Sequence, residues 1–235
     1  TLARNLVSRL MDKNQLQQVT NRSLSFRFRW TMAMLAVGVL LPTCSSSAAV
    51  KTGDSNPASL KETRTRAINY LKTTQADDGS WTTPNAVGIC AVATTALLRN
   101  GVSPKDPTVA KALKHLLKFV QKDGGIYYSK SNHRNYETCI SILAFHAANK
   151  NGQYTKLIKN GEMFLRKLQW DEGEGLESSD EAYGGAGYGK HQRPDLSNTQ
   201  FLIEALKTAG VKSDDPAMKK ALKFVSRAQN LESEH

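Results

Sequence analysis

The chain alternates between segments in which apolar residues recur every three to four positions and short segments rich in Gly, Pro, Asp and Asn. Recurrence at that spacing is typical of α-helices, and the intervening residues mark helix ends. The pattern predicts helices over residues 60–75, 87–100, 106–122, 136–149, 154–169 and 196–209, and a seventh from residue 215. No segment alternates apolar and polar residues for long enough to predict a strand, so the sequence indicates an all-α fold.

Several predicted helix ends carry specific signals. An Asp-Pro pair opens the third and the seventh helix, at Asp106-Pro107 and Asp215-Pro216. An aspartate side chain can accept hydrogen bonds from the free amides of the first turn, where proline is also tolerated. Gly101 follows the second helix and is the expected residue for a C-terminal stop.

The predicted helices fall into two sets. One set carries lysines on an otherwise apolar helix, as in residues 112–117 and 221–224. The other is apolar nearly all round, as in residues 89–98 and 140–145. Because a helix that is apolar on every side must be buried, whereas a charged stripe must face water, we expect helical hairpins with the second set inside.

A short phrase recurs at the ends of the lysine-bearing helices: an apolar pair, a glutamine, and then a glycine and an aromatic residue. The glutamines lie 46, 48 and 60 residues apart, a spacing typical of repeat architectures. A primary amide can serve both free carbonyls and free amides at helix ends, so we interpret the phrase as a structural staple. Its members are Gln75, Gly79 and Trp81, then Gln121, Gly125 and Tyr127, then Gln169, Gly185 and Tyr188, and finally Gln229.

The formal net charge of +11 changes this picture little. Residues 1–50 hold six Lys or Arg and one acidic residue, so nearly half of the excess lies there. The remaining positive charges are spread singly along helices. A nucleic-acid-binding surface would need them clustered on one face, so we expect no nucleic-acid partner.

The first 50 residues have the features of a targeting segment. Arg22, Arg27 and Arg29 precede an apolar run over residues 30–41, and small residues follow it. This run is shorter than the ~20 residues that span a bilayer, so we predict a signal segment over residues 1–50, a linker over 51–58, and export to the periplasm or cell envelope. An imperfect lipobox ending at Cys44 leaves membrane association through a lipid as an alternative.

Three cysteines make no disulfide framework. Cys90 and Cys139 lie within apolar helical runs. We therefore expect each of them to be a free thiol, packed as a small hydrophobic residue.

Residues 59–235 resemble the prenyltransferase and squalene-cyclase repeat family. The strongest matches are Gln75-x3-Gly79-Ser80-Trp81, which is close to the family's QW motif, and Pro-Asp-Leu-Ser-Asn-Thr at residues 194–199. The resemblance implies an α/α toroid in which the buried helices line a central cavity, and members of this family act on isoprenoids. Seven helices would make an incomplete ring, so we expect either a longer natural chain or self-association through the open flank.

The catalytic residues of that family have no full counterpart in this chain. In the triterpene cyclases the middle aspartate of Pro-Asp-x-Asp-Asp-Thr protonates an alkene, but Ser197 stands at that position, followed by Asn198. A serine hydroxyl is too weak an acid for this step. Asp195 matches the first aspartate and could instead cap the next helix. The prenyltransferase branch holds zinc with an Asp-x-Cys pair, which the sequence lacks, so we expect no metal and no cofactor.

Acidic side chains crowd the segment between the fifth and sixth predicted helices. The spacing matches no EF-hand loop, so we interpret the segment as a solvated loop. The acidic residues are Asp171, Glu172, Glu174, Glu177, Asp180 and Glu181.

The best candidate for a ligand site lies where two of the predicted helices begin. If the ring forms, these residues would stand near the mouth of the cavity, with helix capping as the alternative role: Asn135, Tyr136, Glu137, Asp195, Ser197 and Asn198. We therefore expect an exported repeat protein that binds a hydrophobic or isoprenoid-like ligand or an envelope protein. A terpenoid cyclase-like or prenyltransferase-like enzyme is the alternative.

Overall fold

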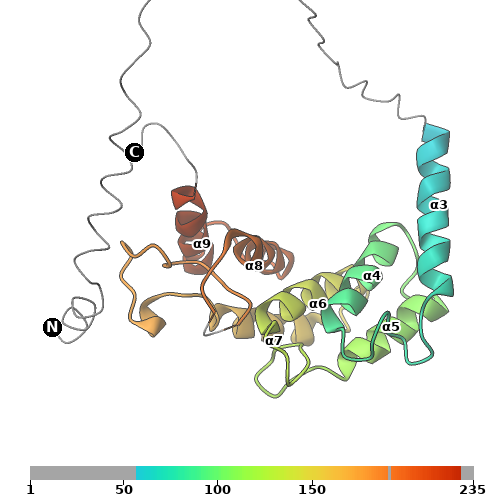
Figure 1. Ribbon diagram of the computed structural model, residues 1–235, viewed down its shortest axis with the longest axis horizontal. Helices are drawn as coiled ribbons and strands as arrows, with labels where there is room; N and C mark the ends of the chain where they lie inside the picture. Colours follow the sequence, from blue (N-terminus) through green and yellow to red (C-terminus); the bar gives the residue numbers. More distant parts are fainter. Residues whose placement is uncertain (1–56, 190–191, 229–235) are drawn as a thin grey trace, which may run out of the picture. The chain divides into compact units, whose positions relative to one another are not determined.

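The computed structural model describes residues 57–189 and 192–228, and within them the chain is helical (Figure 1). The helices are α3 (Pro57–Thr73), α4 (Val87–Arg99), α5 (Pro107–Leu117), α6 (Arg134–Ala148), α7 (Thr155–Arg166), α8 (Leu196–Thr208) and α9 (Pro216–Arg227), with a short 3-10 turn, η1 (Glu172–Glu174), between α7 and α8. Two isolated β-bridges occur in the described ranges, but no strand. The all-α prediction is confirmed. The predicted signal segment, Cys44 and Gln229 lie outside the described residues.

The predicted helix ends agree best where a capping residue marks them. Asp106 and Asp215 cap α5 and α9, accepting hydrogen bonds from the amides of Thr108 (3.0 Å) and Ala217 (2.9 Å). Gly101 follows α4 with a φ of +86°, a conformation that favours glycine. These cap predictions are confirmed.

The third predicted helix ends five residues early, the largest such difference among the described helices. α5 stops at Leu117, whereas the sequence pattern continues to residue 122. Val120 instead forms an antiparallel bridge with Ile126. The apolar residues after Leu117 therefore belong to the loop that turns back, which periodicity alone cannot distinguish from a last helical turn.

The helices form two layers. α4, α6 and α8, here called the inner helices, lie side by side with α6 in the middle (Figure 1). α3, α5, α7 and α9, the outer helices, pack behind them: α5 contacts α4 and α6, α7 contacts α6 and α8, and α9 contacts α8. Eleven of the 15 residues of α6 are buried, as expected for a helix that is apolar on nearly every side.

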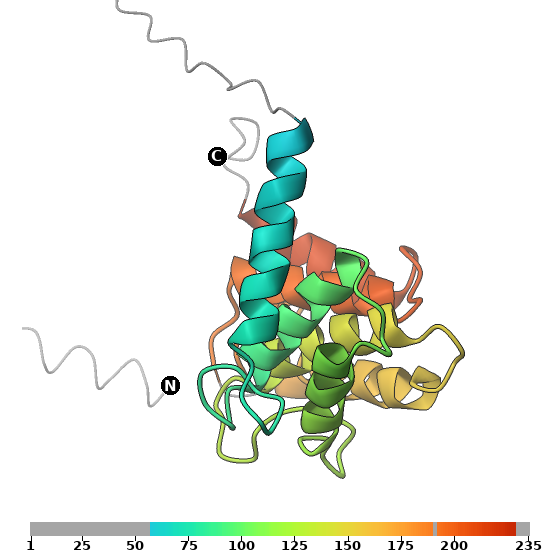
Figure 2. The same cartoon turned by 90° about the vertical axis from the view of Figure 1, so that its right-hand side faces the viewer.

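One hydrophobic cluster connects these helices, and α3 lies at its margin. The buried members of the cluster run from Trp81 to Met218, whereas α3 contributes only the partly buried Ile68 and Leu71. α3 packs against α4 at one end of the layers (Figures 1 and 2). Among the described residues, no helix has the length and apolar character needed to cross a membrane.

Candidate functional site

The loops that follow α3, α5 and α7 approach the next outer helix through a glycine. Each of these glycines has a positive φ: Gly79 (+92°), Gly124 (+93°) and Gly184 (+87°). A Cβ added to them would lie 2.5, 2.7 and 1.9 Å from backbone oxygens in α5, α7 and α9. The counterparts of Gly79 are therefore Gly124 and Gly184, each one residue before the glycine named from the sequence, Gly125 or Gly185.

Gln75 connects its own loop to the next outer helix. Its side-chain nitrogen donates to the carbonyl oxygens of Gly79 (3.1 Å) and Thr108 in α5 (2.9 Å). Gln121 differs, because its side chain donates to Phe119 (3.1 Å) and Tyr127 (2.7 Å), both within its own loop. The glutamine of the middle repeat therefore braces a loop without reaching the next helix through these bonds.

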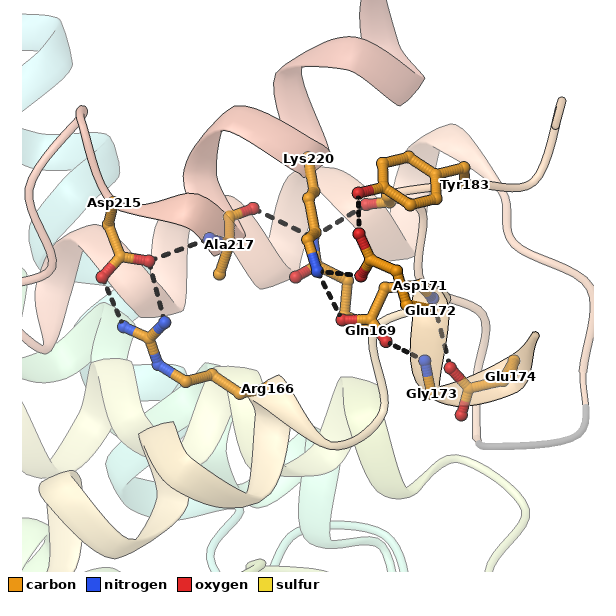
Figure 3. A network of polar contacts seen from close by, with 11 residues as sticks. Arg166, Gln169, Asp171, Glu172, Gly173, Glu174, Tyr183, Asp215, Ala217 and Lys220 are labelled. Atoms are coloured by element: carbon orange, nitrogen blue, oxygen red, sulfur yellow. Dashed lines mark hydrogen bonds and ion pairs between the residues drawn. The ribbon is translucent and has the colours of Figure 1, made fainter. Parts of the chain in front are cut away.

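Gln169 repeats the arrangement of Gln75 (Figure 3). Its amide nitrogen donates to the carbonyl oxygens of Gly184 and of Ala217 in α9, both at 2.9 Å. Nearby, the Arg166 guanidinium donates two hydrogen bonds to the Asp215 carboxylate, at 2.8 and 2.9 Å. Gln169 and the Arg166–Asp215 pair together fasten the end of α7 to the start of α9.

A matching ion pair joins α3 to α5. Lys72 Nζ lies 2.6 Å from Asp106 Oδ2. Lys72 precedes Gln75 by three residues, just as Arg166 precedes Gln169, and in each case the aspartate is the N-cap of the next outer helix. We call these two assemblies the helix clamps.

The acidic segment between α7 and α8 is anchored at its start, whereas Glu177, Asp180 and Glu181 are exposed, as expected for a solvated loop. Lys220 of α9 binds the carboxylates of Asp171 (2.9 Å) and Glu172, and Tyr183 Oη donates to Glu172 (2.6 Å) (Figure 3). The hydrogen bond from Lys220, and then that from Tyr183, lowers the pKa of Glu172 to about 2. Opposite charge on α9 therefore holds the start of this segment in place.

The three aromatic residues of the repeat phrase lie in different surroundings. Trp81 and Tyr127 are buried, and Trp81 Nε1 donates to the carbonyl of Leu71 (2.9 Å). Tyr188 is 42% exposed and contacts His133 edge-on, with ring centroids 4.8 Å apart. The aromatic position of the third repeat therefore contributes little to the core.

Two of the candidate ligand residues are buried near the start of α6. The Glu137 carboxylate accepts hydrogen bonds from Tyr128 N (3.0 Å) and Ser131 Oγ (2.8 Å), so it supports the loop before the helix. Burial raises the pKa of Glu137, although both hydrogen bonds act in the opposite direction. Asn135 Oδ1 accepts from Cys139 Sγ (3.4 Å), while Asn135 Nδ2 has no hydrogen-bond partner among the described residues.

Two more are engaged with each other at the start of α8. The Asp195 carboxylate accepts hydrogen bonds from the backbone amide (2.8 Å) and side-chain amide (2.7 Å) of Asn198. Asp195 is therefore the N-cap of α8, which confirms the capping role that the sequence allowed. Asn198 is buried, and Ser197 is exposed.

Tyr136 brings the starts of the inner helices together. Its half-buried ring meets Phe201 of α8 edge-on, with centroids 5.0 Å apart and planes at 87°. A Cβ added to Gly88 of α4 would lie 3.0 Å from Cε1 of the same Tyr136 ring. Ser197 precedes Phe201 by one helical turn and so lies on the same side of α8.

The exposed side chains of α4 extend this surface. Val92 follows Gly88 by one turn and is 47% exposed, and Ile89 is 49% exposed. Farther along, Arg99 of α4 forms an ion pair with Glu204 of α8 (3.0 Å). We call the surface made by Ile89, Val92, Arg99, Tyr136, Ser197, Phe201 and Glu204 the inner-helix face.

The sequence pointed to only part of this face. Tyr136 and Ser197 were among its candidates, but Arg99 and Glu204 lie 105 residues apart, and no local pattern relates them. Val92 could not be separated from the buried residues, because the helix that carries it is apolar on most sides.

Three further reactive side chains are inaccessible or already bonded. Cys90 and Cys139 are free and buried, as predicted, and burial raises the pKa of Cys90 to about 12. Both ring nitrogens of the buried His115 face carbonyl oxygens, those of Asp78 (3.0 Å) and Pro84 (2.8 Å). Within the described ranges no three His, Cys, Asp or Glu side chains gather in a group that could hold a metal ion.

A comparison of the chain with protein-family models finds no match, and a comparison with curated proteins finds no significant match either.

Proposed function

We propose that the chain is an exported binding module of the α/α-toroid type, and that its inner-helix face takes a hydrophobic, isoprenoid-like ligand. The observation that supports this proposal is the exposure of Ile89 and Val92, at 49% and 47%, on an inner helix whose other side chains are largely buried. Tyr136 and Phe201 continue the same apolar surface. Contiguous exposed apolar area on a folded protein commonly marks a place where a ligand or a partner binds.

The polar groups at the ends of the inner-helix face suit a ligand with an apolar body and a polar end. The Ser197 hydroxyl lies at one end, and the exposed Arg99–Glu204 pair lies at the other. Ligand sites typically combine an apolar lining with a few polar groups that set the ligand's orientation. Arg99 could bind an anionic head group by a charge-assisted hydrogen bond.

A fluorescent farnesyl analogue tests the binding proposal. We expect saturable binding to the full chain, and Val92→Asp should weaken it at least about tenfold, because a charge replaces apolar contact at the centre of the face. Met163→Asp is the matched control, since Met163 is 46% exposed on the outer helix α7. Equal loss of affinity in both variants, or no saturable binding to the native chain, would contradict the proposal.

The enzyme alternative has a separate test. The purified chain is incubated with squalene and with prenyl diphosphates, and products are measured by mass spectrometry. Asp195→Asn is the informative variant, because asparagine also caps helices and so preserves α8 while removing the carboxylic acid. Turnover by the native chain that this variant loses would defeat a role limited to binding.

The sequence also allowed an envelope protein as partner. The structural feature that favours a protein partner is a separate groove between α3 and α4.

A further inference from the structure

A groove with a volume of about 610 Å³ runs between α3 and the C-terminal end of α4. Most of its lining is apolar: Leu60, Ala67, Ile68 and Leu71 from α3, and Ala96 and Leu97 from α4. None of residues 58–73 is buried, and Leu60 is 59% exposed. The apolar side of α3 is therefore largely uncovered along the described chain.

The repeat shows what covers this position elsewhere. α4 packs against the next outer–inner pair, α5 and α6, and α6 packs against the pair α7 and α8. The apolar side of α5 is accordingly buried at Val109, Leu113 and Leu116. The pair formed by α3 and α4 leaves the equivalent packing position open, and no described helix occupies it. By analogy with the other pairs, an inner helix would fit this position.

The charge of the groove restricts the helix that would fit. Lys61 and Arg64 line it, and none of the described side chains that line it is acidic. α3 as a whole carries four basic residues and one acid, Glu62. One of the basic residues, Lys72, is already paired with Asp106, outside the groove. The groove is therefore complementary to a helix that carries carboxylates beside its apolar face.

We propose that the α3–α4 groove is the docking site for an acidic amphipathic helix of a partner protein. The apolar face of that helix packs against Ile68, Leu71 and Ala96, in the way that α4 packs against α5 and α6. Its carboxylates pair with Lys61 and Arg64 at the rim. This is recognition of a helix in a groove, with anchors spaced at i, i+3, i+4 and i+7.

A fluorescein-labelled 18-residue peptide tests the proposal by fluorescence anisotropy. The peptide has leucines at i, i+3, i+4 and i+7 and glutamates elsewhere, and its counterpart has lysines in place of the glutamates. We expect saturable binding of the glutamate peptide to the full chain, and binding of the lysine peptide at least about tenfold weaker.

Variants on α3 locate the binding. Ile68→Glu should abolish it, and Arg64→Glu should weaken it at least about tenfold, by reversing a charge at an exposed position without disturbing the core. Tyr70→Glu is the matched control, because Tyr70 is 67% exposed on the same helix and does not line the groove. Val92→Asp should leave peptide binding unchanged, which separates this site from the inner-helix face.

Four outcomes would overturn the proposal. The first is no saturable binding of the glutamate peptide, and the second is an equal loss of binding in Tyr70→Glu and Arg64→Glu. The third is binding only to phosphatidylglycerol vesicles, lost in Arg64→Glu, which would assign α3 to a membrane surface. The fourth is a concentration-dependent dimer that Ile68→Glu dissociates while the peptide does not bind, because a second copy would then occupy the groove.

Discussion

At the scale of single residues, three glycines allow the loops to lie directly on the backbone of the next outer helix. Gly79, Gly124 and Gly184 all have positive φ, and all three would bring a Cβ within 2.7 Å of a backbone oxygen. Such a contact cannot be relieved by a side-chain rotation, since both groups belong to the main chain. These glycines therefore contribute to the spacing between consecutive outer helices.

Gly124→Ala should be strongly destabilising for two reasons. The left-handed conformation costs an L-residue about 1–2 kcal/mol, and the new Cβ would also lie 2.7 Å from the carbonyl oxygen of Asn160. Gly101→Ala is the control, because Gly101 has a φ of +86° but no atom within 4 Å of an added Cβ. In urea unfolding, Gly124→Ala should lose at least about 1 kcal/mol more than Gly101→Ala. Equal losses would mean that only the backbone conformation matters.

At the scale of helices, the clamps join each end of the repeat array by the same chemistry. Lys72 and Arg166, each near the end of an outer helix, bind the aspartates that cap α5 and α9. Arg166 also binds Glu162, whose carboxylate is buried within α7. A cap aspartate therefore satisfies amides of its own helix and holds the preceding outer helix at the same time.

The clamps predict a loss of stability in acid. The hydrogen bond with Arg166 lowers the pKa of Asp215, and that with Lys72 lowers the pKa of Asp106. A carboxylate whose folded pKa lies below its unfolded value, about 3.9, stabilises the fold above that pH. The contribution is then lost as the pH falls through the lower, folded pKa.

Asp215→Asn tests this contribution. Asparagine keeps the cap but not the charge, so we expect a loss of about 1 kcal/mol at pH 7 and a weaker dependence of the unfolding free energy on pH below about 4. Asp214→Asn, at the exposed neighbouring position, is the control. Urea unfolding between pH 7 and pH 2.5 gives both quantities. An unchanged pH profile in Asp215→Asn would show that the clamp does not stabilise the fold electrostatically.

At the scale of the described domain, we expect the helices to differ in their stability against local opening. α6 lies between α4 and α8 and buries most of its residues, whereas α3 buries none of residues 58–73. Helices in water gain most of their stability from packing, so a helix with little buried surface opens at a lower free energy.

Hydrogen exchange should show this difference directly. We expect backbone amides of α3 to exchange at least about a hundredfold faster than those of α6, because local opening of α3 exposes little buried surface. Mass spectrometry of peptides covering residues 57–73 and 134–148 measures both rates. Addition of the glutamate peptide should slow exchange in α3 if that peptide fills the groove, and exchange in α6 should not change.

Local sequence signals specify the helices and several of their ends. Apolar spacing places the seven helices, and the pairs Asp106-Pro107 and Asp215-Pro216 mark two starts, because capping acts within a single turn. A signal for the clamps was also present, since an Asp-Pro pair lies between Gln75 and Gln121 and between Gln169 and Gln229, but not between Gln121 and Gln169. Gln75 and Gln169 donate hydrogen bonds to carbonyl oxygens of the next outer helix.

Which of these residues meet depends on how the helices pack. Packing brings Gly124 and Gly184 close to the next outer helix, places Glu137 where it supports a loop, and joins Arg99 to Glu204. The groove between α3 and α4 is equally a product of packing. Contacts of this kind depend on the rotation and offset of helices that are far apart in the chain, and a periodic pattern specifies the buried side of a helix but not its neighbour.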